Sequence, residues 1–416
     1  MRKLHLLFVF LLLACNVAAQ ISETAAPSYI RSIVFTQWGE EFGNTPIIQL
    51  GDGLRLEFDD IIGDEADYYY RIEFYNKDWT PSQLSKSEYL EGFDNLRIES
   101  TGNSFNTLQL YTHYQLLLPN ANTQALTRSG NYMLHVYDQE GEEVFSRKFI
   151  IYEDLTQVRL SVVRPLEVKN IPYQHTLHFS IHPEDLILKN PSQNVDAVLI
   201  QNANLKTAIT DLPPQFTSGN NLVYRYDAAS SFWAGNEYLN FDSKDLRAAT
   251  SSIERIELNQ LYHHYLHPTR FRSLEPYTYN PDINGSFMIN TTRGNQKELE
   301  AEYVWVHFSL LAPQDQQGEV HIYGGFNNFH LDSSTLLTFN NATERYEGAR
   351  LFKQGFYNYK YVLLTPDGTI DEGYFSGNYR ETENQYTVLV YYREPGGRYD
   401  RIIGMGTANS RELTGG

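Results

Sequence analysis

An alternation of apolar and polar residues, repeated along almost the whole chain, is the feature that most limits its fold. In the segment YRIEFY, Tyr70, Ile72 and Phe74 lie two positions apart, and two similar runs flank a turn at residues 138–141. Residues two apart share one face of a β-strand, so this period predicts half-buried strands rather than helices. Such runs recur about every ten to fifteen residues, which is typical of sandwiches. The sequence therefore predicts an all-β fold of two or three consecutive β-sandwich domains.

The aromatic content agrees with this fold class. The chain has 31 Tyr and 23 Phe but only 4 Met. Tyrosine suits sheets because its ring packs against neighbours while its hydroxyl reaches a polar partner or water. A single cysteine excludes a disulfide framework, so stability has to come from a buried core. The length of 416 residues suggests roughly two to four domains.

The N-terminus predicts export from the cytosol. Arg2 and Lys3 precede an apolar run at residues 6–14, and small residues follow at 17–19. This arrangement is typical of a signal peptide over residues 1–19, cleaved before Gln20, because the apolar run is too short to span a bilayer. An alternative interpretation is a lipoprotein in which Cys15 is lipidated and retained.

The balance of charges limits the classes of partner that the protein can bind. The formal net charge is −18, from 33 basic and 51 acidic residues. A surface of this sign is repelled by phosphate backbones, so nucleic acid is excluded as a partner. After the signal segment, no stretch is apolar enough to cross a membrane as a helix.

Composition shifts divide the mature chain into predicted units. We expect an N-terminal β-sandwich at 26–155, a middle β-domain at 156–291 and a C-terminal domain at 300–392. The polar stretch TTRGNQKELEAE separates the last two. The Gly- and Arg-rich residues 393–416 are predicted to be an extended tail.

The C-terminal unit contains the motifs that are most informative about local structure. A strand leads into the turn of HIYGGFNNFH, and a second turn precedes GFYNYKY. This unit resembles immunoglobulin-like early-set domains of the glycogen-binding type. In that family the position after the Phe-Asn pair tends to be Trp, whereas here Asn328 follows. An alternative prediction is therefore a glycan-stacking platform made from other aromatic side chains: Phe329, Tyr357, Tyr359 and Tyr361.

Several motifs, in order along the chain, resemble the plug protein family of the type IX secretion system. They are NKDWTPS at residues 76–82, YLEGF at 89–93, SFNT at 104–107, YTHY at 111–114, DING at 282–285 and YYREP at 391–395. The resemblance extends from about residue 28 to 404. It implies a non-enzymatic gating subunit from Bacteroidota. Such a subunit occupies the periplasmic mouth of a giant outer-membrane β-barrel translocon and closes it until cargo engages. It needs no cofactor, and other subunits of the system are possible partners. The alternative function is a secreted glycan-binding or glycan-processing protein.

Aromatic residues on turns are the candidates for contact with the barrel, because interface hot spots favour Trp and Tyr. They are Trp79, Tyr89, Phe232 and Trp233. The competing interpretation for Trp79 is that it caps the core of the first sandwich, as most tryptophans are largely buried.

Enzymatic motifs are lacking in the sequence. It contains no Gly-x-Ser-x-Gly elbow, His-Glu-x-x-His pair or phosphate loop. His263 and His267 could share a metal on a helix, but in a strand His263 and His264 point to opposite faces. The acidic run at 64–67 lacks the spacing of a calcium loop. We therefore predict no catalytic residue and no metal site.

Overall fold

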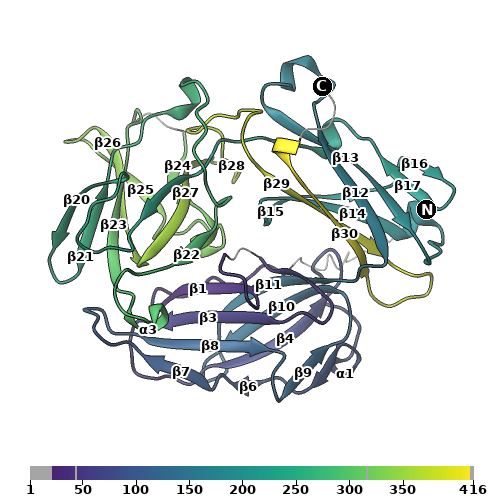
Figure 1. The fold of residues 1–416 in the computed structure, drawn as a ribbon, viewed down its shortest axis with the longest axis horizontal. Coiled ribbons are helices and arrows are strands. Elements are labelled where there is room, and N and C mark those ends of the chain that lie inside the picture. The colour runs from purple at the N-terminus through teal and green to yellow at the C-terminus, as the bar shows by residue number, and fades with distance from the viewer. Residues whose placement is uncertain (1–20, 43–44, 315–316, 413–416) are drawn as a thin grey trace, which may run out of the picture.

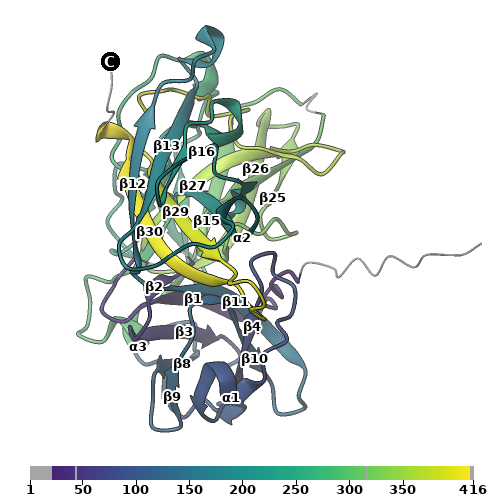
Figure 2. The ribbon, with the colours of Figure 1, turned by 90° about the vertical axis from the view of Figure 1, so that its right-hand side faces the viewer.

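The structure is a computed structural model that describes residues 21–42, 45–314 and 317–412. Its strands form three β-domains around a common centre, with the first domain at the bottom of Figure 1, the third at the upper left and the second at the upper right. The side view in Figure 2 shows the second and third domains standing on the first. The all-β prediction is confirmed. The predicted signal peptide and Cys15 lie outside the described residues.

The first domain is a sandwich of two sheets. The predicted alternation holds, since Tyr70, Ile72 and Phe74 are all buried in its core. One sheet has the order β1 (Ile30–Gln37), β3 (Leu54–Asp60), β8 (Thr112–Leu118), β7 (Ser100–Asn103). The other has the order β2 (Ile47–Gln49), β11 (Glu143–Tyr152), β10 (Gly130–Tyr137), β4 (Tyr69–Tyr75), β6 (Leu96–Arg97). The short elements α1 (Lys86–Tyr89), β5 (Leu90–Gly92) and β9 (Thr123–Leu126) cover one end.

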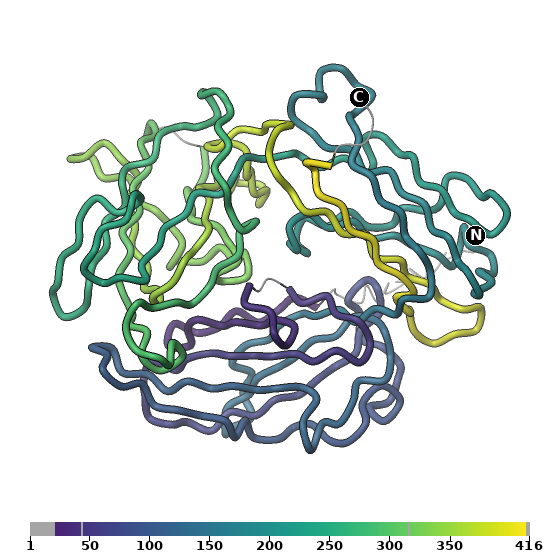
Figure 3. The backbone as a smooth tube through the Cα atoms, viewed as in Figure 1, coloured from purple at the N-terminus to yellow at the C-terminus, as the bar shows by residue number. Residues whose placement is uncertain are grey.

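The second domain is a sandwich built from two distant stretches of chain. One sheet has the order β12 (Thr156–Val163), β13 (Gln174–Pro183), β17 (Asn221–Tyr224), β16 (Phe216–Ser218), and β18 (Ser231–Trp233) also pairs with β13. The other has the order β15 (Asn204–Leu212), β14 (Val195–Gln201), β29 (Gln385–Tyr392), β30 (Arg401–Asn409). The helix α2 (Pro191–Asn194) precedes β14. Figure 3 shows the C-terminal strands, in yellow, returning to this domain after the third domain is complete.

The third domain, residues 239–371, is a single ten-stranded sheet that closes around one core. Its order is β19 (Leu239–Asp242), β27 (Gly355–Leu364), β24 (Glu319–Tyr323), β25 (Leu336–Asn340), β26 (Arg345–Lys353), β23 (Tyr303–Leu310), β21 (Tyr262–Leu266), β20 (Ile253–Leu258). Two short strands, β22 (Phe287–Ile289) and β28 (Ile370–Asp371), pair with β27, and α3 (Lys297–Glu300) precedes β23.

Three predicted boundaries are therefore wrong. Residues 239–289, assigned to the middle unit, belong to the third domain through the pairing of β19 and β22 with β27. Residues 385–392, assigned to the third unit, pair with β14 of the second domain. Residues 401–409 are not an extended tail but the strand β30, paired with β29.

Glycines explain why β30 was mistaken for a tail. Gly404 and Gly406 face β12 of the opposite sheet, and a Cβ at Gly406 would lie 2.7 Å from Val158 Cγ1. Glycine here permits a close approach of two backbones. Directly before them, Ile402 and Ile403 are fully buried. Glycine-richness in this segment thus reflects packing, not disorder.

The junction between the first and third domains contains a buried ion pair. Lys353 Nζ lies 2.6 Å from Asp59 Oδ2, and the Tyr303 hydroxyl donates to the same oxygen at 2.7 Å. His113 Nδ1 lies 2.7 Å from the other oxygen. Burial opposes the charge of Asp59, but Lys353 and His113 outweigh it and hold the pKa of Asp59 below its ordinary value. This carboxylate is therefore fully matched by its partners.

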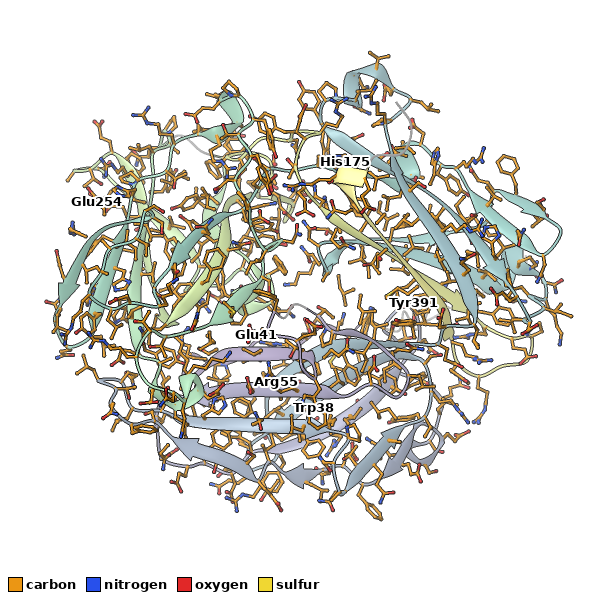
Figure 4. The ribbon with its side chains drawn as sticks, viewed as in Figure 1. Trp38, Glu41, Arg55, His175, Glu254 and Tyr391 are labelled. Atoms are coloured by element: carbon orange, nitrogen blue, oxygen red, sulfur yellow. The ribbon has the colours of Figure 1, made fainter. Side chains whose placement is uncertain are left out.

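The junction between the first and second domains is mostly apolar. A cluster there joins Trp79 and Met133 of the first domain to Ile200 and Leu389 of the second. At its edge the Tyr391 hydroxyl donates to Asn131 Oδ1 at 2.7 Å, at the point where Figure 4 labels Tyr391 between the two domains. Burial of these side chains fixes the second domain on the first.

The second and third domains also touch directly. Asn204 Nδ2 donates to the Tyr323 hydroxyl at 3.1 Å, and Lys206 Nζ donates to the Phe329 carbonyl at 2.9 Å. Each domain thus contacts both others. Within the described ranges, no helix is long and apolar enough to cross a membrane.

Candidate partner-binding surface

A large cavity of about 1310 Å³ opens between the second and third domains. We call it the interdomain cleft. Its second-domain side comes from the β14–β15 turn and β18, and its third-domain side comes from β27, β28 and the loop that follows. Sites between domains are common binding sites because two surfaces converge there.

Trp233, one of the four predicted contact residues, lines this cleft and is 58% exposed. Its neighbour Phe232 is 5% exposed and packs against the Tyr386 ring at 5.5 Å between centroids. Strand β18 puts consecutive side chains on opposite faces, which sends Phe232 into the core and Trp233 out of it. A contact residue has to be exposed, and of these two residues only Trp233 is.

Two tyrosines missed by the sequence reasoning accompany Trp233. Tyr374 lines the same cleft and is 37% exposed. Tyr173, 47% exposed, precedes β13, and its carbonyl accepts a hydrogen bond from Ala234 N at 2.9 Å. We call Tyr173, Trp233 and Tyr374 the aromatic rim. The turn residues around Tyr374, in the segment EGYFSGNY, were the one available signal.

The wall of the cleft below the rim is polar. Lys360 is buried, with its Nζ 3.6 Å from Glu372 Oε2 and 4.0 Å from the centre of the Tyr238 ring. Asp367 and Asp371 also line the cleft. The arrangement combines exposed aromatic rings, a residue type that is enriched at protein interfaces, with a mixed polar wall.

Asp282 lies at the junction between the second and third domains, in a smaller cavity lined by residues of both domains. Asp282 accepts hydrogen bonds from the backbone N–H groups of Tyr238 and Asn284. Burial, aided by the nearby charge of Glu237, raises the pKa of Asp282 to about 6 despite those hydrogen bonds. The cavity also contains Glu383. This carboxylate therefore holds its proton more tightly than an exposed aspartate.

The other two predicted contact residues are structural. Trp79 is 8% exposed in the apolar junction between the first two domains, with Lys148 Nζ 4.2 Å from its ring centre. Tyr89 is buried in the first-domain core beside Phe74. As they stand, neither side chain presents a surface to a partner. The competing interpretation, that Trp79 belongs to a core, agrees with its burial.

The residues predicted as a glycan platform are also buried. Phe329, Tyr357, Tyr359 and Tyr361 are each 3% exposed or less. The three tyrosines face the third-domain core, where Tyr357 stacks on the Phe241 ring at 5.0 Å. A pyranose could not stack on any of these rings without unfolding the domain. The platform alternative is therefore wrong for these side chains.

The histidine segment forms a strand, not a helix. His263 and His264 occupy β21, where His263 Nδ1 lies 2.8 Å from His307 Nε2 and His264 points into the core. Among the described residues, no three His, Cys, Asp or Glu side chains are grouped to hold a metal.

Comparisons with known proteins agree with the motifs. Residues 30–153 match the family model described as "Type 9 secretion system plug protein 1st domain". A crystal structure of a hypothetical protein from Parabacteroides merdae is 30% identical, with a TM-score of 0.89, and covers 94% of this chain and 100% of its own. No curated protein matches.

Two further solved structures carry no weight because their TM-scores are 0.16. One is the BSP domain of a biofilm associated protein, 10% identical, covering 95% of this chain and 61% of its own. The other comprises extracellular domains 3–5 of Drosophila OTK, 11% identical, covering 93% and 98%. The matched first domain and the similarity over the whole chain lead to one conclusion. The chain belongs to the type IX secretion system plug protein family, whose members are non-catalytic, and its role is related to type IX secretion.

Proposed function

We propose that this protein is a plug that closes the periplasmic mouth of the outer-membrane translocon barrel of the type IX system until cargo engages. The mechanism is steric occlusion. It requires no bond chemistry, only a body that keeps its shape while it covers a pore.

The observation that supports this proposal is the closed arrangement of the three domains. Each contacts the other two, through the Asp59–Lys353 pair, the cluster around Trp79 and the Asn204–Tyr323 hydrogen bond. A chain of domains with one contact each could bend at its linkers. Three mutual contacts remove that freedom, so the body acts as one broad obstacle.

The aromatic rim is the proposed contact with the barrel. Trp233, Tyr173 and Tyr374 are all exposed, and Trp233 and Tyr374 line the interdomain cleft. Exposed Trp and Tyr supply large contact areas at low cost in side-chain entropy and dominate many interfaces. In this proposal Trp79, Tyr89 and Phe232 act indirectly, by holding the domains that carry the rim.

The test has two parts. A tagged copy is used to recover partners from detergent-solubilised outer membranes, and the recovered barrel is then inserted into a planar bilayer. We expect the chain to copurify with a very large β-barrel and to lower the conductance of the isolated barrel when added on the periplasmic side.

Trp38 provides a matched control because it is also 58% exposed, but it lies on the first domain away from the cleft. Trp233→Ala should weaken barrel capture by about tenfold or more, as expected for a hot-spot residue. Trp38→Ala should leave it unchanged. Recovery of no barrel would contradict the plug role. Equal loss in both variants would contradict the rim as the contact.

A further inference from the structure

A second cavity, of about 300 Å³, lies between the first and third domains and has an unusual charge. Three arginines line it: Arg31 on β1, Arg147 on β11 and Arg350 on β26. Among the described lining residues the one carboxylate is Asp332. The fourth cation, Lys353, is already paired with Asp59. An excess of positive charge is thus enclosed in a protein whose net charge is −18.

Protein contacts neutralise the three arginines only in part, because Asp332 is the one carboxylate among the described lining residues. Arg350 Nη1 donates a hydrogen bond to the Ser334 hydroxyl and lies 3.9 Å from Asp332 Oδ1, and the Arg350 side chain is only 11% exposed. Arg31 Nε is buried and has no hydrogen-bond partner among the residues that the structure describes. Arg147 is 8% exposed, and its Nη1 donates to the Ser146 carbonyl at 2.7 Å. Buried guanidinium groups normally have partners, because an unpaired buried charge is costly.

The arginines also oppose one another. Burial, and then the nearby charge of Arg31, lower the pKa of Arg350 to about 10. Burial together with Lys206 and Arg147 lowers the pKa of His330, another lining residue, to about 4. His330 is therefore neutral at neutral pH, and its Nε2 is a further buried atom without a partner in the described chain. These groups share a positive potential that an anion would relieve.

The rest of the wall is apolar and aromatic. The Phe326 and Phe352 rings lie beside the Arg350 guanidinium, at 5.4 and 5.9 Å from their centres. Ile30 and Leu351 complete this side. The segment at residues 25–28 forms another wall, and Ala25 and Ser28 are exposed, so the cavity reaches solvent there. A guanidinium fork matches the geometry of a carboxylate or phosphate, while the rings suit an apolar body.

We propose that this cavity binds a small organic oxyanion, with Arg31 and Arg350 holding its carboxylate or phosphate group and the Phe326–Phe352 wall contacting its apolar part. The volume suits a compact ligand and not a folded chain. Because residues of both domains line the cavity, the ligand would also bridge them. The inference does not depend on the plug role.

Isothermal titration calorimetry on the full mature chain, at constant ionic strength, tests this with three probes of one shape. Benzoate and phenyl phosphate carry an oxyanion, whereas benzamide is neutral. We expect one or both anions to bind, and benzamide to bind about tenfold more weakly or worse, since hydrogen bonds to charged groups are the stronger ones. The melting temperature should rise with the concentration of the anion that binds.

Variants that are expected to change the affinity for the anion in opposite directions distinguish a binding site from a general loss of structure. Arg350→Gln should weaken anion binding about tenfold or more, and Arg350→Lys should weaken it less because charge remains but the fork is lost. Asp332→Asn removes the lining carboxylate and should strengthen binding several-fold. Arg345→Gln is the matched control, on the same strand but an odd number of positions away and so on its opposite face.

Two results would overturn the proposal. The first is that neither anion binds, or that benzamide binds as well as they do. The second is that Asp332→Asn, shown to be folded by circular dichroism, fails to strengthen binding, or that Arg345→Gln weakens it as much as Arg350→Gln. If benzoate binds and phenyl phosphate does not, the ligand class is a carboxylate, and the reverse result indicates a phosphate.

Discussion

Two carboxylates at two domain junctions, one buried and one partly buried, have pKa values shifted in opposite directions. Asp59, between the first and third domains, has Lys353, His113 and Tyr303 within hydrogen-bonding distance, and its pKa is lowered. Asp282, between the second and third domains, receives backbone hydrogen bonds, but desolvation and then the charge of Glu237 raise its pKa to about 6. The ionised form strengthens the first junction and strains the second. The junction that borders the interdomain cleft is therefore the one under electrostatic strain.

The largest expected loss of stability comes from removing Lys353, the cation of the buried Asp59–Lys353 pair. Lys353→Met leaves Asp59 charged, buried and without its main partner, and should lower the free energy of unfolding by about 3–5 kcal/mol. Urea denaturation monitored by tyrosine fluorescence measures the loss. Asp59→Asn combined with Lys353→Met should recover part of the stability, because no unpaired charge remains. A double variant no more stable than the single one would contradict this account of the junction.

The cluster at the apolar junction contains no carboxylate, so it provides a reference for the other two junctions. Trp79→Ala removes a ring from the cluster between the first and second domains and should cost about 3 kcal/mol. Because the contact is apolar, the cost should be the same at pH 5 and pH 7.5, as measured by parallel denaturation curves. A loss that varies strongly with pH would show that the cluster is coupled to a titrating group and is not a purely apolar contact.

The contribution of Asp282 to folding stability should depend on pH in the opposite way from that of an aspartate with a lowered pKa, such as Asp59. Asp282 keeps its proton in the folded state up to about pH 6, whereas the unfolded chain releases it near 3.8. The folded state thus binds more protons between these values, so its stability falls as pH rises from about 4 to about 7. We expect this contribution to be about 2 kcal/mol, because partial exposure reduces the full effect of the shift.

Asp282→Asn should abolish that decline, so the variant gains stability relative to the parent as pH rises. The lost acceptor strength toward Tyr238 and Asn284 is a constant cost at all pH values. Asp371→Asn, an exposed position in the same domain, is the control. If the parent and Asp282→Asn lose stability in parallel over this range, Asp282 does not strain the junction.

Local patterns in the sequence predicted strands well and their partners poorly. Alternation around Tyr70 and the turn at 138–141 identified β4 and the β10–β11 hairpin, because these features are set by neighbouring residues. The pairing of β14 with β29 joins segments nearly 200 residues apart, and no local pattern encodes it. For the same reason the sequence alone does not predict the pairing of Asp59 with Lys353, which are 294 positions apart.

The candidate site was predicted only in part, because period two does not say which face is buried. In Ser231–Trp233 either aromatic residue could have faced the core, and the choice depends on the neighbouring strand β13 and on Tyr386. The same limit explains the tyrosines of β27. Their spacing of two places them on one face of the strand, but the core of a ten-stranded sheet lies on that face.

The smallest effect on stability is expected at Trp233, which is exposed, unlike the residues at the domain junctions. Trp233→Ala removes a ring that is 58% exposed and should change the free energy of unfolding by about 0.5 kcal/mol or less. Phe232→Ala, one residue earlier, opens a cavity in the second-domain core and should cost about 3 kcal/mol or more. Denaturation curves of the two variants measure this difference directly. A stable Trp233→Ala protein that no longer captures the barrel would locate the contact at the aromatic rim, since its fold is unaltered. If Trp233→Ala instead unfolds as readily as Phe232→Ala, the ring supports the junction between the second and third domains, and the rim has to be sought elsewhere.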